Sequence, residues 1–206
     1  GPGDGKTSLA TNLSAAFVET GQRTIVVNAD FRRPRLAHAV ADRPPDAHPF
    51  VLDDLEVLAP KSLLMRTDLP GLLLMDLSTI EGTAGDLVRA TAGMMPGLSE
   101  MCDSIVVDTS PVGATAEVLD MVPFADVILV SVRLGHTSIA AAQRTVAVLR
   151  DVTTAPILLV INSVKQERAP YYEYSDRRNP PSDQQSGWRG RLRSGRRSES
   201  QPEKVG

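Results

Sequence analysis

The chain has 206 residues, 42% of them hydrophobic, which suits one α/β domain with a sizeable core and a tail. It has no apolar run of about 18 residues, which excludes a transmembrane helix within it, and its single cysteine, Cys102, excludes an internal disulfide framework. Residues 1–164 carry 12 basic and 19 acidic side chains, whereas residues 165–206 carry 10 basic and 6 acidic ones.

The first predicted element is a glycine-rich loop, Gly1-Pro2-Gly3-Asp4-Gly5-Lys6-Thr7-Ser8. Its glycines let consecutive backbone N–H groups turn toward one concavity, where they can cradle phosphate oxygens. Lys6 supplies a charge for the β- and γ-phosphates, and Thr7 supplies a hydroxyl for Mg²⁺. A helix predicted over about 7–20 would aim its N-terminal dipole at the same phosphates. The alternative is a Gly/Pro turn before an ordinary helix, but the pattern favours nucleotide binding by residues 3–8.

A phosphate loop normally follows a buried strand. Here the loop stands at residue 1, and the chain does not begin with methionine. We therefore expect a fragment of a longer protein, whose sheet lacks its first strand, a central one, in this chain.

Five apolar runs predict buried strands that alternate with helices. Continuous apolar runs are typical of parallel strands covered on both faces, and the alternation favours a doubly wound α/β fold with a mostly parallel sheet. Residues 42–70, rich in Pro and Asp, are expected to form an irregular excursion with one short helix. The predicted strands are 24–27, 72–75, 105–107, 127–130 and 157–161, and the helices after the first are 84–101, 115–122 and 137–151.

Polar residues follow several predicted strands, at the edge where ligands collect in such sheets. Asp30 is placed to bind Mg²⁺ or to take a proton from an attacking hydroxyl. Asp108 would hold Mg²⁺, through water, opposite the Thr7 hydroxyl, although an aspartate after a strand is often a cap or turn residue. Arg32 and Arg33 could neutralise phosphate charge, pair with carboxylates of a neighbouring subunit, or form a solvated turn.

The last part of the chain carries two further signals. All three tyrosines lie in Tyr171-Tyr172-Glu173-Tyr174, which predicts either an aromatic patch on the domain or a mobile acceptor segment for phosphoryl transfer. The arginines at 189–197 lie among Gly, Ser and Pro, a composition that predicts disorder; they form either a solvated tail or a contact with an anionic membrane surface. Nucleic-acid binding is not expected because the folded part is acidic. No metal-ligand spacing surrounds the histidines, so none has a predicted role: His38, His48 and His136.

Three segments, taken in order, resemble the bacterial tyrosine kinases, the autokinases of capsular and exopolysaccharide export within the deviant-Walker ATPases related to MinD and ParA. The resemblance covers residues 1 to about 174. The second segment, which matches the family motif D-x-D-x-R-R-P, distinguishes these kinases best, because the broader deviant-Walker ATPases share the other two segments. The segments are Pro2-Gly3-Asp4-Gly5-Lys6-Thr7, Val26-Val27-Asn28-Ala29-Asp30-Phe31-Arg32-Arg33-Pro34 and Val106-Val107-Asp108-Thr109-Ser110-Pro111-Val112, followed by the tyrosines.

This resemblance implies a P-loop NTPase-like fold and an ATP- and Mg²⁺-dependent protein-tyrosine kinase. Lys6 and Thr7 would belong to the Walker A loop, Asp30 to the Walker A′ motif and Asp108 to Walker B, with Asn162 at the adenine edge. The implied catalytic residues are Lys6, Asp30 and Asp108; the metal ligands are Thr7, Asp30 and Asp108; and the phosphoacceptors are Tyr171, Tyr172 and Tyr174.

The resemblance also implies partners and a place in the cell. Family members act in the cytoplasm at the inner face of the plasma membrane, phosphorylate a neighbouring subunit in a ring, and are activated by a chain-length-regulator type of membrane protein, fused or separate. Asn28 stands where the family has the first Asp of D-x-D, which we expect to weaken Mg²⁺ organisation. A MinD/ParA-like ATPase with water as acceptor and a non-catalytic nucleotide-binding partner of the export machinery are the alternatives.

Overall fold

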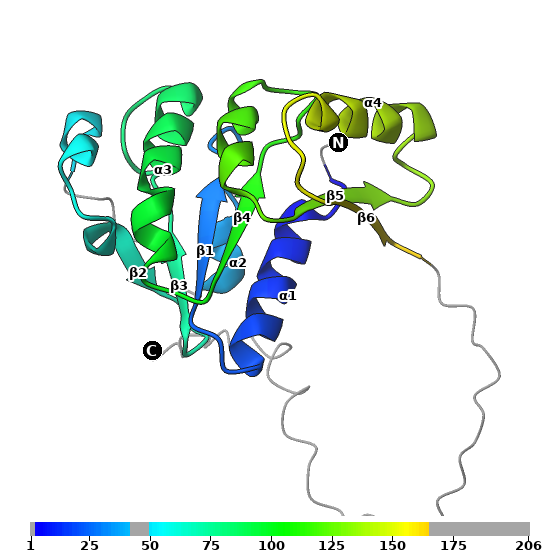
Figure 1. The fold of residues 1–206 in the computed structure, drawn as a ribbon. Coiled ribbons are helices and arrows are strands. Elements are labelled where there is room, and N and C mark those ends of the chain that lie inside the picture. The colour runs from blue at the N-terminus through cyan, green and yellow to red at the C-terminus, as the bar shows by residue number, and fades with distance from the viewer. Residues whose placement is uncertain (1–2, 42–49, 165–206) are drawn as a thin grey trace, which may run out of the picture. The chain divides into compact units, whose positions relative to one another are not determined.

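The computed structural model describes residues 3–41 and 50–164, which form strands with helices on both faces of a sheet (Figure 1). One sheet has the strand order β2-β3-β1-β4, and β5 pairs with β6 in a second, parallel sheet. All described pairs are parallel except β2 with β3. The strands are β1 (Thr24–Ala29), β2 (Leu64–Arg66), β3 (Leu72–Met75), β4 (Ser104–Thr109), β5 (Ile128–Arg133) and β6 (Ile157–Asn162). The predicted mostly parallel α/β fold is confirmed.

The described strands thus form two hydrogen-bonded groups, and β4 and β5 are not paired with each other.

Helices cover the two faces of the larger sheet. Helices α1 (Lys6–Glu19) and α2 (Leu36–Val40) pack on the face to which Val26 belongs. Helix α3 (Ala84–Ser99) packs on the opposite face, with Ile25 and Val27. Because side chains alternate along a strand, Asn28, two positions after Val26, also belongs to the α1 face.

The register between β1 and β4 is set at the start of both strands. The Arg23 guanidinium donates to both carboxylate oxygens of Asp103, and the Arg23 backbone N–H donates to Oδ2 of the same carboxylate at 2.9 Å. The hydrogen bonds from Arg23 lower the pKa of the exposed Asp103 carboxyl to about 2. This register pairs Asn28 with Asp108 at the carboxyl ends of the strands.

Several details differ from the sequence-based expectation. The predicted helix 115–122 is a 3-10 helix, η3 (Glu117–Phe124), rather than an α-helix. The predicted helix 137–151 is α4 (Ile139–Arg150). Strand β6 is not covered on both faces, because Leu158 and Leu159 are 53% exposed.

The described part of the excursion 42–70 is more regular than expected. It contains two 3-10 helices, η1 (Leu52–Glu56) and η2 (Pro60–Leu63), and the short strand β2, rather than one helix. Helix α2 was not predicted at all, since five residues are too few to show a helical period. No helix in the described ranges is both long and apolar enough to cross a membrane.

Candidate nucleotide-binding site

The glycine-rich loop adopts a backbone that only glycine accommodates easily. Gly3 and Gly5 both have φ of 80°, in the left-handed region, and α1 begins directly after Gly5. The first N–H groups of a helix have no partner within it, and no side chain caps α1. The loop and the helix start therefore offer backbone donors and a positive dipole end to an anion, as predicted for a phosphate site.

Asp4 anchors this loop to the second sheet. Its carboxylate is 1% exposed and accepts a 2.8 Å hydrogen bond from Thr137 Oγ1, while His136 Nδ1 lies 3.4 Å from the same oxygen. The Asp4 carbonyl accepts from Asn162 Nδ2 at 2.9 Å and from the Ser131 hydroxyl. The loop is thus held by residues at the carboxyl ends of β5 and β6, and any contact of Asp4 with phosphate would come from its backbone.

Two residues, His136 and Asn162, contact the phosphate loop in ways that the sequence did not predict. His136, which received no role, contacts the loop; the signal was missing because 132 residues separate it from Asp4. Asn162 was assigned to the adenine edge, but its Nδ2 donates to the Asp4 carbonyl and, at 2.7 Å, to Ser131 Oγ. Its amide therefore fixes the position of the phosphate loop, and its contact with adenine stays a prediction.

Replacing Gly5 by alanine is expected to lower both stability and nucleotide affinity. A Cβ at this position would lie 3.1 Å from Asn162 Nδ2, and the left-handed backbone costs an L-residue about 1–2 kcal/mol. Thermal denaturation and ATP titration calorimetry measure the two effects. Gly3→Ala has the same backbone strain with no neighbour within 4 Å, so a larger loss for Gly5→Ala isolates the Asn162 contact. Gly113→Ala, with open space and no positive φ, is the neutral control.

The loop also meets Asp108, which is 3% exposed at the end of β4. Burial raises the pKa of the Asp108 carboxyl, and the Asp30 charge adds to this, whereas the hydrogen bond with Thr7 and the charge of Lys6 lower it. The structure thus brings together four predicted site residues: Lys6, Thr7, Asp30 and Asp108. Their assembly follows from the fold, because β1 and β4 are paired in parallel and Thr7, near the start of α1, contacts Asp108 at the end of β4.

Asp30 lies in the turn after β1 and is held by two donors to Oδ1. The Ser110 hydroxyl donates at 2.7 Å and the Arg33 backbone N–H at 3.2 Å. Ser110 is 5% exposed and was not predicted as a site residue, although it lies two positions after Asp108. It connects the turn after β1 with the turn after β4, so the two aspartates are positioned as one unit.

Arg32 has a partner within the chain. Its guanidinium donates to Glu117 Oε1 at 2.9 Å, at the start of η3. The backbone N–H of Glu117 and then Arg32 lower the pKa of that carboxyl. Arg32 thus forms an ion pair within the molecule while its side chain stays 54% exposed, and its three predicted roles stay predictions.

The donor set fits a magnesium ion that is completed by a nucleotide. Among residues 3–41 and 50–164, no group of three or more His, Cys, Asp or Glu side chains could hold a metal alone. Mg²⁺ commonly takes one or two carboxylates, with waters and substrate phosphates as the other ligands. The Thr7 hydroxyl beside the Asp108 carboxylate offers such a partial set. The predicted phosphoacceptors Tyr171, Tyr172 and Tyr174 lie outside the described residues.

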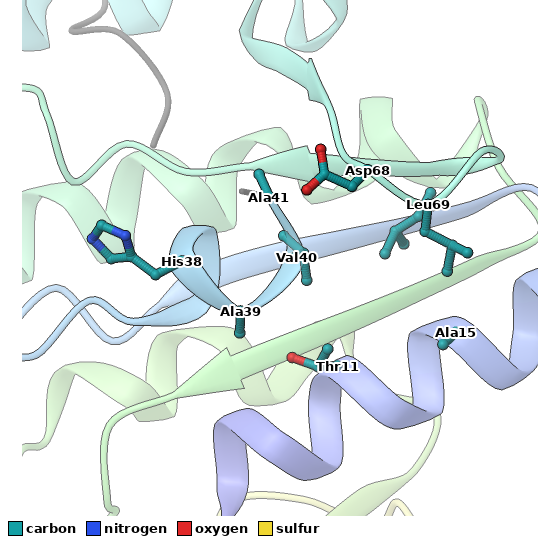
Figure 2. A pocket seen from close by; sticks show the side chains of 9 residues that line it. Thr11, Ala15, His38, Ala39, Val40, Ala41, Asp68 and Leu69 are labelled. Atoms are coloured by element: carbon teal, nitrogen blue, oxygen red, sulfur yellow. The ribbon is translucent and has the colours of Figure 1, made fainter. Parts of the chain in front are cut away.

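A separate hollow of about 290 Å³ lies between α1, α2 and the β2–β3 turn (Figure 2). Apart from Thr11, His38 and Asp68, its lining is aliphatic, and it contains none of the predicted site residues. The candidate nucleotide site is therefore the surface around the loop and not this hollow.

Comparison with known proteins gives one relative in sequence and several in fold. No family model matches the chain. A tyrosine-protein kinase, ptk, of Acinetobacter johnsonii is 22% identical over 173 residues, which is 82% of this chain and 23% of that protein. The chain thus spans about a quarter of the length of this curated relative.

Solved structures share the fold at low identity. The kinase domain of the Escherichia coli tyrosine kinase ETK has a TM-score of 0.66 at 17% identity, covering 83% of this chain and 69% of that one. The septum site-determining protein MinD of Pyrococcus horikoshii, solved with Mg-ADP, has a TM-score of 0.62 at 17% identity, covering 78% and 66%. The chain is therefore similar to a bacterial tyrosine kinase in sequence and has the P-loop NTPase fold that such kinase domains share with MinD.

Proposed function

We propose that the chain is the nucleotide-binding domain of an ATP-dependent protein-tyrosine autokinase. The contact of Thr7 with the buried Asp108, beside Asp30 and beneath the glycine loop, carries this proposal. A phosphate loop, a hydroxyl and a carboxylate for Mg²⁺, and a second carboxylate near the acceptor are the parts that phosphoryl transfer needs. The sequence similarity to a tyrosine-protein kinase supports tyrosine as the acceptor.

Each residue has a defined task in this mechanism. The loop N–H groups and Lys6 would hold the β- and γ-phosphates, and the Thr7 hydroxyl and Asp108 would hold Mg²⁺. Bound Mg²⁺ would supply charge neutralisation on the phosphates. The tyrosine oxygen forms a bond to the γ-phosphorus while the bond to the β–γ bridging oxygen breaks and ADP leaves. Asp30 orients the phenol and accepts its proton, and Ser110 and the backbone of Arg33 keep Asp30 in place.

The family resemblance supports the wider setting of the proposal. The acceptors are Tyr171, Tyr172 and Tyr174 of a neighbouring subunit in a ring-like assembly, and the domain works at the cytoplasmic face of the membrane with a chain-length-regulator type of activator. Its role is to regulate capsular or exopolysaccharide synthesis and export. The basic segment 189–197 would contact anionic lipid.

The direct test is product analysis with the full chain, Mg²⁺ and ATP labelled at the γ-phosphate. Label recovered as phosphotyrosine in the peptide that contains 171–174 is the expected result. Release of labelled inorganic phosphate without phosphotyrosine would overturn the kinase proposal. That outcome would support the second candidate, a MinD-like ATPase, which the fold similarity to MinD favours.

Absence of both products, with Mg²⁺-dependent ATP binding retained in calorimetry, would instead support a non-catalytic nucleotide-binding partner. Absence of ATP binding would overturn all three candidates, because each depends on the same loop.

A further inference from the structure

Asn28, the residue that departs from the D-x-D pattern, has a buried carboxylate beside it. Asn28 Nδ2 donates to Asp76 Oδ1 at 2.8 Å, and both residues are 1% exposed. Asp76 Oδ1 also accepts the Ser78 backbone N–H at 2.9 Å. The sequence did not indicate this contact, since 48 residues separate the two side chains and Asp76 belongs to no recognised motif.

The sheet explains why these side chains meet. Val27 of β1 pairs with Met75 of β3, so Asn28 and Asp76 are the next residues along two neighbouring parallel strands. Asn28 also pairs with Asp108 of β4. By side-chain alternation all three belong to the α1 face. They form a row at the carboxyl ends of β3, β1 and β4, with Asn28 between two acidic residues.

The contact also fixes which way the Asn28 amide points. Because its NH₂ group donates to Asp76, its Oδ1 is directed to the other side, where it accepts the Asp30 backbone N–H at 3.0 Å. That bond closes the turn that presents Asp30. A carboxylate at position 28 could accept from Asp30 equally well, but it could not donate to Asp76.

We propose that Asn28 and Asp76 act as a buried donor–acceptor pair, in which the Asp76 carboxylate accepts the hydrogen bond from the Asn28 amide. Asp76 acts as a positioning residue, which holds the Asn28 amide so that the turn carrying Asp30 keeps its shape. Asn28→Asp alone would therefore not restore a D-x-D site, because two carboxylates at hydrogen-bonding distance disfavour each other's charged form. Asn28→Asp with Asp76→Asn reverses the donor and the acceptor and keeps the hydrogen bond between the two side chains, but it loses the bond that Asp76 Oδ1 accepts from the Ser78 N–H.

A double-mutant cycle in the free energy of unfolding, measured by denaturant titration at neutral pH, tests the pair without ATP. Asn28→Asp is expected to lower the folding constant about 10- to 100-fold, and adding Asp76→Asn should recover part of that loss, because the bond between positions 28 and 76 returns while the Ser78 N–H loses its acceptor. Asn12→Asp, at an exposed position of α1, is the matched control and should change little. Additive effects of the two exchanges would overturn the proposal.

The positioning role rests on the proposed kinase function and has its own measurement. Asp76→Ala is expected to lower kcat for phosphotyrosine formation with little change in KM for ATP, and the conservative Asp76→Asn should retain most of kcat. Equal kcat for wild type and Asp76→Ala would overturn the positioning role. Coupling in the unfolding cycle without any phosphotyrosine from the wild type would overturn the kinase function and leave the Asn28–Asp76 donor–acceptor pair intact.

Discussion

Replacing Lys6 by methionine is expected to reduce phosphotyrosine formation about 100- to 1,000-fold, the usual loss when one preorganised group that stabilises transferring charge is removed. Lys6 is the first residue of α1 and directly follows Gly5, which has a left-handed backbone. It therefore belongs to the glycine-rich loop that is proposed to bind the phosphates. Its charge also lowers the pKa of the buried Asp108 carboxyl. The variant should therefore bind the Mg²⁺ nucleotide less tightly, because the contact with the phosphates is lost, and it should also transfer phosphate more slowly. Phosphotyrosine blotting of the full chain and ATP calorimetry measure the two losses.

Lys61→Met is the matched control for this substitution, because Lys61 is exposed on η2, outside the candidate site. It removes the same charge and should leave both measurements unchanged. If Lys6→Met and wild type were labelled equally, the assignment of the loop as the catalytic phosphate site would be wrong.

The parts of the site that sequence predicted are those with a local signature. The Lys6–Thr7 pair follows alternating glycines, and Asp108 follows an apolar strand, so residue type and neighbours suffice to suggest their chemistry. Their meeting then follows from the parallel fold, in which strand ends share one edge. In the structure, Thr7 and Asp108 do contact each other through a side-chain hydrogen bond.

The parts that sequence missed are pairs of ordinary polar residues far apart in the chain. Thr137 and Asp4 are 133 positions apart, and Ser110 and Asp30 are 80 apart. Neither periodicity nor motif spacing reports such contacts, because they depend on strand order and on register. The consequence for this site is large, since these contacts determine where the loop and Asp30 lie.

The short elements were missed for a related reason. Helix α2 and strand β2 have five and three residues, too few for a period to show. Leu36 of α2 is fully buried, so packing against the sheet rather than helix propensity accounts for that helix. Strand β6 shows the opposite case: its continuous apolar sequence predicts a buried strand, but the described residues leave several of its apolar side chains exposed.

Asp30→Asn is expected to lower kcat for phosphotyrosine formation about 100- to 10,000-fold, the range for loss of a positioned general base, while Mg²⁺-dependent ATP affinity stays close to that of wild type. The asparagine is isosteric, and its carbonyl oxygen can still accept from Ser110 Oγ and the Arg33 N–H, so the turn should be preserved. Quench-flow labelling gives kcat, calorimetry gives the affinity, and Asp126→Asn at an exposed position is the matched control. A parallel fall in ATP affinity would instead identify Asp30 as a metal ligand, whereas unchanged kcat would remove it from the mechanism. Lys6→Met, by contrast, should lower both kcat and ATP affinity. Comparing the two variants therefore separates nucleotide binding by Lys6 from activation of the acceptor by Asp30.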